Sequence, residues 1–178
     1  GQSMALARAY EHAGFAPETV EIVEAHGTGT KAGDAAEFNG LKLIFDAKED
    51  GPKQWCALGS VKSQIGHTKA AAGSAGLIKA AMALYNKTLP PTIKVEKPQE
   101  AMTAANSPFY VNTETRPWIP RGDHPRRAGI SALGFGGSNF HCLLEEYQPL
   151  KATADWQGDV QIAAFSGADE AGLEAALQ

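Results

Sequence analysis

The sequence has little cysteine, no long hydrophobic run and no excess of positive charge. Cys56 and Cys142 are too few for a disulfide framework, so we expect two buried free thiols. No CxxC or HxxxH spacing occurs among these cysteines and the 5 histidines, which removes the usual zinc patterns and predicts no metal. The 16 basic and 20 acidic residues give a net charge of −4, which argues against a nucleic-acid-binding surface.

Two further absences concern membranes and export. No apolar run approaches the roughly 18 residues that span a bilayer, and the first ten residues lack the charged start and apolar block of a signal peptide. We therefore expect a cytoplasmic protein that does not enter a membrane. The sequence starts at Gly1 instead of a methionine and stops at Gln178 inside a helical pattern. We expect one end to lie inside a domain and the other inside a linker.

The residues that are present indicate a folded α/β protein, with 43% hydrophobic and 20% charged residues. Apolar periodicity and glycine or proline breaks predict helices and strands in alternation. The predicted helices cover residues 3–13, 34–46 and 68–86, and the predicted strands cover 20–24, 55–61, 109–112, 127–133 and 138–146. This order predicts a layered sheet with parallel neighbours and one antiparallel hairpin. Beyond Pro149 we expect a strand at 160–165 and a helix from 169.

Local patterns define some of these elements more closely. Asp34 and Glu37 form a D-x-x-E capping box that predicts the start of the second helix. Gly73 and Gly76 lie inside the third helix, where each glycine costs about 1 kcal/mol relative to alanine. Such a cost is tolerated where another backbone comes close, so we expect this half of the helix to be buried.

Three glycine-rich loops follow predicted strands, at the sheet edge where α/β proteins bind ligands. His26 lies in EAHGTGT at 24–30, and His67 ends KSQIGH at 62–67. Imidazole suits proton transfer near neutral pH, and a helix N-terminus keeps such a ring neutral. Each feature has a plainer interpretation: a structural turn histidine, or for Lys62 a solvated surface lysine. The third loop, GFGGSN at 134–139, is either an oxyanion hole made of backbone N–H groups or a tight hairpin turn.

A nucleophile is missing from this set. The sequence has no G-x-S-x-G elbow, and neither cysteine has the setting of an activated thiol. A phosphate-binding G-x-x-x-x-G-K-[ST] loop is absent as well. Without a nucleophile, the two histidines do not make a complete catalytic mechanism.

Three segments in this order resemble the β-ketoacyl synthase domain of type I polyketide and polyunsaturated-fatty-acid synthases. They are EAHGTGT with the following Gly33 and Asp34, GSVKSQIGHT at 59–68 with AAAG at 70–73, and GFGGSN at 134–139. The resemblance implies a thiolase-like fold, here its C-terminal half, with α/β/α layers and a mixed five-stranded sheet. It assigns 1–147 to the ketosynthase and 148–178 to the start of the linker that leads to an acyltransferase domain.

The resemblance also implies a role for individual residues. His26 and His67 would be the two catalytic histidines that promote decarboxylation of a malonyl thioester, and Lys62 would organise their site. Thr28 and Thr30 would bind the phosphopantetheine arm of an acyl carrier protein. Phe135 would act as a gate, and the backbone at Phe135 and Gly136 would supply the oxyanion hole. The implied partners are the acyl carrier protein, the N-terminal half of the same ketosynthase, the adjacent acyltransferase and a second copy in a homodimer.

The sequence departs from the family pattern at a few positions. Ser138 stands where threonine is usual, and Ala35 stands where proline is common. The nucleophilic cysteine of the family lies upstream of these motifs. The residue at that position separates a condensing enzyme from two alternatives, a chain-length-factor-like partner and a decarboxylase without condensing activity. A thiolase is less favoured, because Cys142 does not lie in the thiolase motif.

Overall fold

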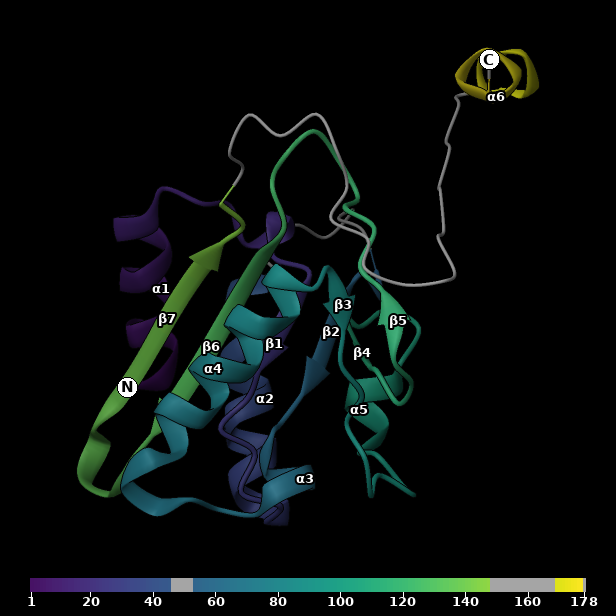
Figure 1. Ribbon diagram of the computed structural model, residues 1–178. Coiled ribbons are helices and arrows are strands. Elements are labelled where there is room, and N and C mark those ends of the chain that lie inside the picture. Colours follow the sequence, from purple (N-terminus) through teal and green to yellow (C-terminus); the bar gives the residue numbers. More distant parts are fainter. Residues whose placement is uncertain (46–52, 148–168, 178) are drawn as a thin grey trace. The chain divides into compact units, whose positions relative to one another are not determined.

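The computed structural model describes residues 1–45, 53–147 and 169–177 (Figure 1). The chain divides into two compact units, Gly1–Tyr147 and Gln148–Gln178. In the second unit the helix α6 (Glu170–Leu177) lies where the sequence predicts one. The strand expected at 160–165 lies outside the described residues. All further results concern the first unit.

A mixed five-stranded sheet forms the centre of this unit, as predicted. Its strands, in spatial order, are β4 (Phe109–Val111), β2 (Cys56–Gly59), β1 (Ile22–Glu24), β6 (Arg127–Leu133) and β7 (Asn139–Glu145). The first four are parallel, and β7 runs antiparallel to β6. In this register Glu24 lies between Gly59 and Ile130. A separate antiparallel pair joins β3 (Thr88–Leu89) to β5 (Arg116–Pro117).

Helices cover both faces of the sheet, which confirms the α/β/α layering (Figure 1). One face packs against α1 (Gln2–Ala13) and α2 (Lys31–Phe45), and the other against α4 (Ala72–Tyr85). The shorter helical segments are η1 (Pro17–Thr19), α3 (Lys62–Ile65), η2 (Lys69–Ala71), α5 (Glu100–Thr103) and η3 (Phe135–Gly137).

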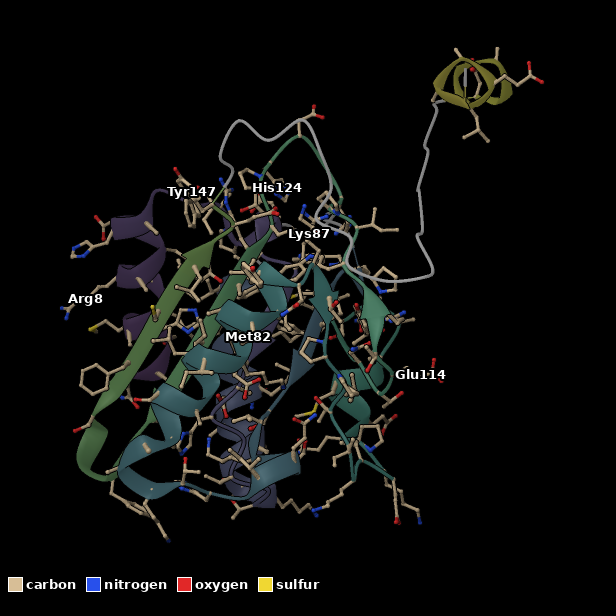
Figure 2. All side chains as sticks on the ribbon, viewed as in Figure 1. Arg8, Met82, Lys87, Glu114, His124 and Tyr147 are labelled. Carbon is tan, nitrogen blue, oxygen red and sulfur yellow. The ribbon has the colours of Figure 1, made fainter. Side chains whose placement is uncertain are left out.

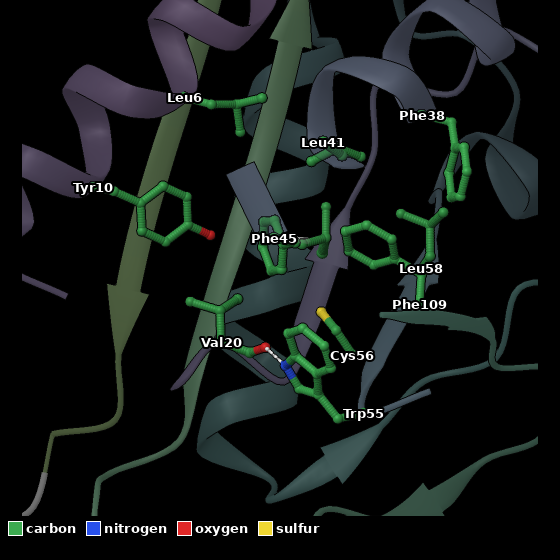
Figure 3. Packing of buried hydrophobic residues seen from close by; sticks show 11 residues of the cluster. Leu6, Tyr10, Val20, Phe38, Leu41, Phe45, Trp55, Cys56, Leu58 and Phe109 are labelled. Atoms are coloured by element: carbon green, nitrogen blue, oxygen red, sulfur yellow. Dashed lines mark hydrogen bonds between the residues drawn. The ribbon is translucent and has the colours of Figure 1, made fainter. Parts of the chain in front are cut away.

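The core beneath α1 and α2 is rich in aromatic side chains (Figure 3). Its members include Leu6, Tyr10, Phe38, Leu41, Phe45, Trp55, Leu58 and Phe109. The Trp55 indole donates a hydrogen bond of 3.2 Å to the carbonyl oxygen of Val20, so its polar atom is satisfied inside the core. This cluster attaches the helix after the first glycine-rich loop to the sheet.

The opposite face holds α4 unusually close to the sheet, as its small residues predict. A Cβ atom on Gly76 would lie 3.0 Å from Cγ of Glu24 and 3.3 Å from Cγ2 of Ile130. A Cβ atom on Gly73 would lie 3.2 Å from Cβ of Ala132. The two interior glycines therefore permit close packing of α4 on β1 and β6.

Several boundaries differ from the sequence-based expectation. The second helix begins at Lys31, so Asp34 lies in its first turn and is not its N-cap. The Asp34 carboxylate accepts the N–H of Gly29 at 3.1 Å, and Glu37 points to a different partner described below. The capping-box prediction is therefore wrong. At the first helix, Gly14 closes the C-terminus with φ 68°, and no side chain caps the N-terminus.

The two cysteines are both free, but only Cys56 is buried. Cys142 is exposed because it lies on β7, an edge strand with one sheet neighbour. The expectation of two buried thiols is therefore wrong for Cys142. Over the described ranges, no group of three or more His, Cys, Asp or Glu side chains could hold a metal ion. Within the same ranges, no helix is long and apolar enough to cross a membrane.

Candidate active site

The three glycine-rich loops lie at one end of the sheet. His26 follows β1 by two residues, and His67 follows β2 through α3. The turn between β6 and β7 carries Phe135, and Figure 1 shows this turn and α3 at the same end of the sheet. The parallel pairing of β1 with β2 and β6 explains this, because it brings their carboxyl ends to one edge.

The two histidines lie in direct contact. Their ring centroids are 5.4 Å apart and their planes make an angle of 81°. His26 is buried, whereas His67 is exposed. Burial lowers the pKa of His26, and the charges of Lys62 and His67 lower it further against an opposing effect of Asp34. His26 is therefore a neutral imidazole at pH 7.

Glu37 fixes the backbone beside His26. Its two carboxylate oxygens accept the N–H groups of His26 at 2.7 Å and Gly27 at 2.9 Å. Burial raises the pKa of Glu37, although these two hydrogen bonds act in the opposite direction. Gly27 has φ 52°, and a Cβ atom there would lie 2.8 Å from Cβ of Ser60. The chain thus turns sharply after His26, between α2 and the end of β2.

Lys62 approaches His26 from the other loop. Its Nζ atom donates a hydrogen bond to the carbonyl oxygen of His26. Burial lowers the pKa of Lys62, while the carboxylates of Glu24 and Glu37 partly offset this effect. Lys62 is partly buried, so it is not the solvated surface lysine of the plainer interpretation.

The backbone after His67 determines which ring nitrogen carries the proton. The N–H of Lys69 donates to Nδ1 of His67 at 3.0 Å, so Nδ1 acts as an acceptor. A neutral ring then has its proton on Nε2. Lys69 has φ 55°, a left-handed conformation that a lysine seldom adopts. The hydrogen bond to His67 therefore depends on a strained turn.

Thr28 and Thr30 lie in the exposed loop after His26, with their hydroxyl oxygens 3.1 Å apart. The hydroxyl of Thr30 also accepts the N–H of Gly33 at 3.2 Å. In the third loop, Phe135 is fully exposed and Gly136 has φ 78°. The geometry thus brings His26, His67 and Lys62 together, while Phe135 stands free of packing at the same end of the sheet.

Sequence reasoning missed two parts of this arrangement. The D-x-x-E pattern predicts a capping role for Glu37, whereas this residue binds the backbone of His26 and Gly27. A second omission is the contact between Glu24 and Lys79, whose charged atoms are 2.8 Å apart. An available signal was a carboxylate inside a buried strand, matched by a lysine inside an otherwise apolar helix.

Chemically, the site offers two adjacent imidazoles in an accessible loop cluster. His26 is a neutral ring, and in His67 the Nδ1 atom accepts a backbone hydrogen bond, which leaves Nε2–H as the donor. Such a donor can stabilise negative charge that develops on an oxygen atom. Among the described residues, no serine or cysteine side chain forms a hydrogen bond to either ring.

Family models match both parts of the chain. The model for the β-ketoacyl synthase C-terminal domain matches residues 1–96, and the model for the ketoacyl-synthetase C-terminal extension matches residues 98–178. A polyunsaturated fatty acid synthase polypeptide of Thraustochytrium sp. is 51% identical over 158 residues, a match that covers 86% of this chain and 6% of that protein. Polyketide synthase PksL of Bacillus subtilis is 50% identical over 142 residues, covering 80% and 3% respectively.

Solved structures give the same result. The ketosynthase from module 6 of the bacillaene synthase of Bacillus subtilis superimposes with a TM-score of 0.77 at 48% identity. A ketosynthase of the bacillaene synthase of Bacillus amyloliquefaciens superimposes with the same score at 39% identity. These matches cover 83% of this chain and about a quarter of each solved chain, at 27% and 26%. The thiolase-like fold expected from the sequence is confirmed.

Proposed function

The chain belongs to the β-ketoacyl synthase family, and on this premise we propose that it supplies the decarboxylating half of a condensing site. The substrate is a malonyl group held as a thioester on the phosphopantetheine arm of an acyl carrier protein. The acyl acceptor is held on a cysteine in the N-terminal half of the domain. The contact between the His26 and His67 rings, 5.4 Å apart at their centroids, is the observation that carries this proposal.

In this reaction the malonyl carboxylate leaves as CO₂, and its bonding electrons remain on the thioester as an enolate. Neutral His26 and the Nε2–H of His67 stabilise the enolate oxygen by hydrogen bonding, an interaction that strengthens as charge develops. The α-carbon then attacks the acyl thioester carbonyl, a C–C bond forms, and the cysteine leaves as a thiolate. Lys62 keeps His26 neutral and holds its backbone, in line with its hydrogen bond to the His26 carbonyl.

The remaining site residues have supporting roles in the proposal. Thr28 and Thr30 present their hydroxyls from an exposed loop, which suits hydrogen bonds to the phosphopantetheine amides. Phe135 gates the entrance, and the backbone N–H groups at Phe135 and Gly136 stabilise the oxyanion formed by attack on the acyl thioester. The full exposure of Phe135 and the left-handed turn at Gly136 support this assignment.

Partners follow from the same premise. We assign 1–147 to the ketosynthase and 148–178 to the start of a linker toward an acyltransferase, and the division into compact units at this boundary supports the assignment. The N-terminal half of the ketosynthase covers the outer side of α4, where every exposed residue is uncharged: Ser74, Leu77, Ile78, Ala81, Met82 and Tyr85. Met82 is labelled on this helix in Figure 2. The complete domain works as a homodimer.

The decisive experiment uses the complete ketosynthase domain, this chain together with its N-terminal segment. His26→Ala and His67→Ala are expected to abolish CO₂ release from malonyl-carrier protein, with a loss of about 100-fold or more. His12→Ala, which changes an exposed histidine on α1, serves as the matched control and keeps full activity. Wild-type rates of CO₂ release in both active-site variants would contradict the proposal.

A further inference from the structure

A buried ion pair lies at the end of β1, two residues before His26. Glu24 is the last residue of β1, and Lys79 extends from α4 with its Nζ atom 2.8 Å from Oε2 of Glu24. Their side chains are only 3% and 10% exposed. The other carboxylate oxygen, Oε1, accepts the N–H of Val61. The Glu24 carboxylate on β1 thus contacts both α4 and the segment that follows β2.

Two glycines without side chains leave room for this ion pair. Gly76 has no side chain where a Cβ atom would lie 3.0 Å from Cγ of Glu24. A Cβ atom on Gly59 would lie 3.8 Å from Nζ of Lys79 and 2.0 Å from Oγ1 of Thr92. Buried ion pairs seldom add stability over apolar residues of similar volume, because both charges lose their hydration. A role other than stability is therefore the better explanation for this pair.

The contacts of Glu24 connect the loop that carries His26 to the segment that begins at Val61. Val61, whose N–H is bound by Glu24, immediately precedes Lys62. Lys62 in turn donates to the carbonyl oxygen of His26, which lies two residues after Glu24. Lys79 holds the carboxylate in place, and it favours the ionised form against burial, which raises the pKa of Glu24. Displacement of the carboxylate would separate the His26 loop from the segment that leads to His67.

We propose that Glu24 and Lys79 are positioning residues that set the placement of His26 relative to the segment from Lys62 to His67. The inference rests on the proposed function for its kinetic readout. Because both side chains are buried, we expect their effect on the chemical step and not on substrate binding.

The test changes Lys79→Met in the complete ketosynthase domain. The rate constant kcat for malonyl decarboxylation is expected to fall about 10-fold or more, with KM for malonyl-carrier protein within about 2-fold of wild type. The double variant with Glu24→Gln and Lys79→Met keeps an acceptor for the Val61 N–H and leaves no unpaired charge. It is expected to recover most of the lost kcat, and it replaces the single variant if that protein does not fold.

The matched control is Arg126→Met, which breaks the ion pair between Arg126 and Glu146. Their charged atoms are also 2.8 Å apart, and the side chains are 14% and 11% exposed. Arg126 precedes β6 and lies at the end of that strand away from the histidine loops. This control is expected to lower the thermal midpoint and leave kcat unchanged.

Two results would overturn the inference. One is a Lys79→Met variant that loses thermal stability like the control but retains wild-type kcat. The other is a crystal structure of that variant with the His26 and His67 ring centroids still 5.4 Å apart, a readout that does not depend on activity. An inactive wild-type domain would instead count against the proposed function, and the structural comparison would then decide the inference alone.

Discussion

The protonation state of His26 depends on a few neighbouring groups. Burial has the largest effect in lowering its pKa, followed by the charges of Lys62 and His67. Asp34, on α2, raises that pKa. The proposed reaction uses a neutral His26, so we expect the balance of these groups to set the acid limit of that reaction.

Lys62→Met is therefore expected to move the acid limb of the pH profile to higher pH. A nearby positive charge disfavours protonation of His26, so its removal raises the pKa of His26 toward the ordinary value. The measurement is kcat for malonyl decarboxylation between pH 5 and 8 in the complete domain. Lys97→Met, at an exposed position, is the control and leaves the limb in place. An unchanged or lowered limb in Lys62→Met would refute the assignment.

His141 makes stability depend on pH through a different group. Burial lowers its pKa to about 4, and its Nδ1 atom lies 3.0 Å from Oγ of Ser131. The unfolded chain binds a proton at a pKa near 6.5. Stability is therefore present above this pH and is lost as the pH falls from about 6.5 to 4, by on the order of 3 kcal/mol.

The check is urea unfolding of the complete domain at pH 7 and pH 4.5, for wild type and for His141→Gln. The variant is expected to show a smaller loss of unfolding free energy between the two pH values. His12→Gln, at an exposed site on α1, controls for the removal of any histidine and keeps the wild-type difference. Equal pH dependence in wild type and His141→Gln would rule out this role.

The helix α4 combines two interior glycines, which lower its helix propensity, with close packing on the sheet. Its buried residues are Ala72, Gly76, Ala80, Ala83 and Leu84. The small side chains bring the helix axis near the sheet, which lets Lys79 reach Glu24 on β1. The small residues therefore allow α4 to lie close to the sheet, although the two glycines among them lower its helix propensity.

Gly76→Ala tests this interpretation of α4. Alanine gains about 1 kcal/mol in helix propensity, but its Cβ atom would lie 3.0 Å from Cγ of Glu24 and 3.3 Å from Cγ2 of Ile130. Overpacking of this kind costs about 1–3 kcal/mol, so we expect a net loss of stability in denaturant unfolding. Ser74→Ala, exposed on the same helix, is expected to stay within about 0.5 kcal/mol of wild type. A more stable Gly76→Ala would contradict the close approach.

The elements were largely predictable because glycine and proline interrupt clear apolar patterns, and β6 has the predicted bounds 127–133. The start of α2 was not predictable from its capping box, since the N–H of Asp34 bonds to the carbonyl oxygen of Thr30 and the helix begins earlier. The Lys69 N–H donates to Nδ1 of His67 from a left-handed backbone, which a lysine in the sequence does not predict. Tertiary contacts decide both features.

In the molecule as a whole, the outer side of α4 is an exposed apolar helix face. Ile78, Met82 and Tyr85 are 63%, 55% and 80% exposed. An exposed apolar helix face marks an interface. The chain spans about a quarter of the length of the solved ketosynthases that it matches, so much of the fold of those relatives lies beyond it.

Introducing charge on this face is expected to prevent assembly of the complete domain. Ile78→Asp combined with Met82→Asp would bury two carboxylates against the N-terminal half, and the yield of soluble domain should fall about 10-fold or more. Leu43→Asp is the control, because Leu43 is 71% exposed on α2, on the opposite side of the sheet. Size-exclusion chromatography and yield are the measurements. Normal yield of a folded double variant would argue that this face remains in solvent.

The central position of β1 has a consequence for inactivation by heat. This strand is hydrogen-bonded to a neighbour on each side, and all three of its residues are buried. Amide hydrogens in such a strand exchange with solvent only in the largest opening events of a protein. The backbone of His26, two residues after this strand, is held by Glu37 and Lys62. Activity should therefore disappear on heating together with the slowest-exchanging amides, in one cooperative step, and should outlast the fraying of the edge strand β7.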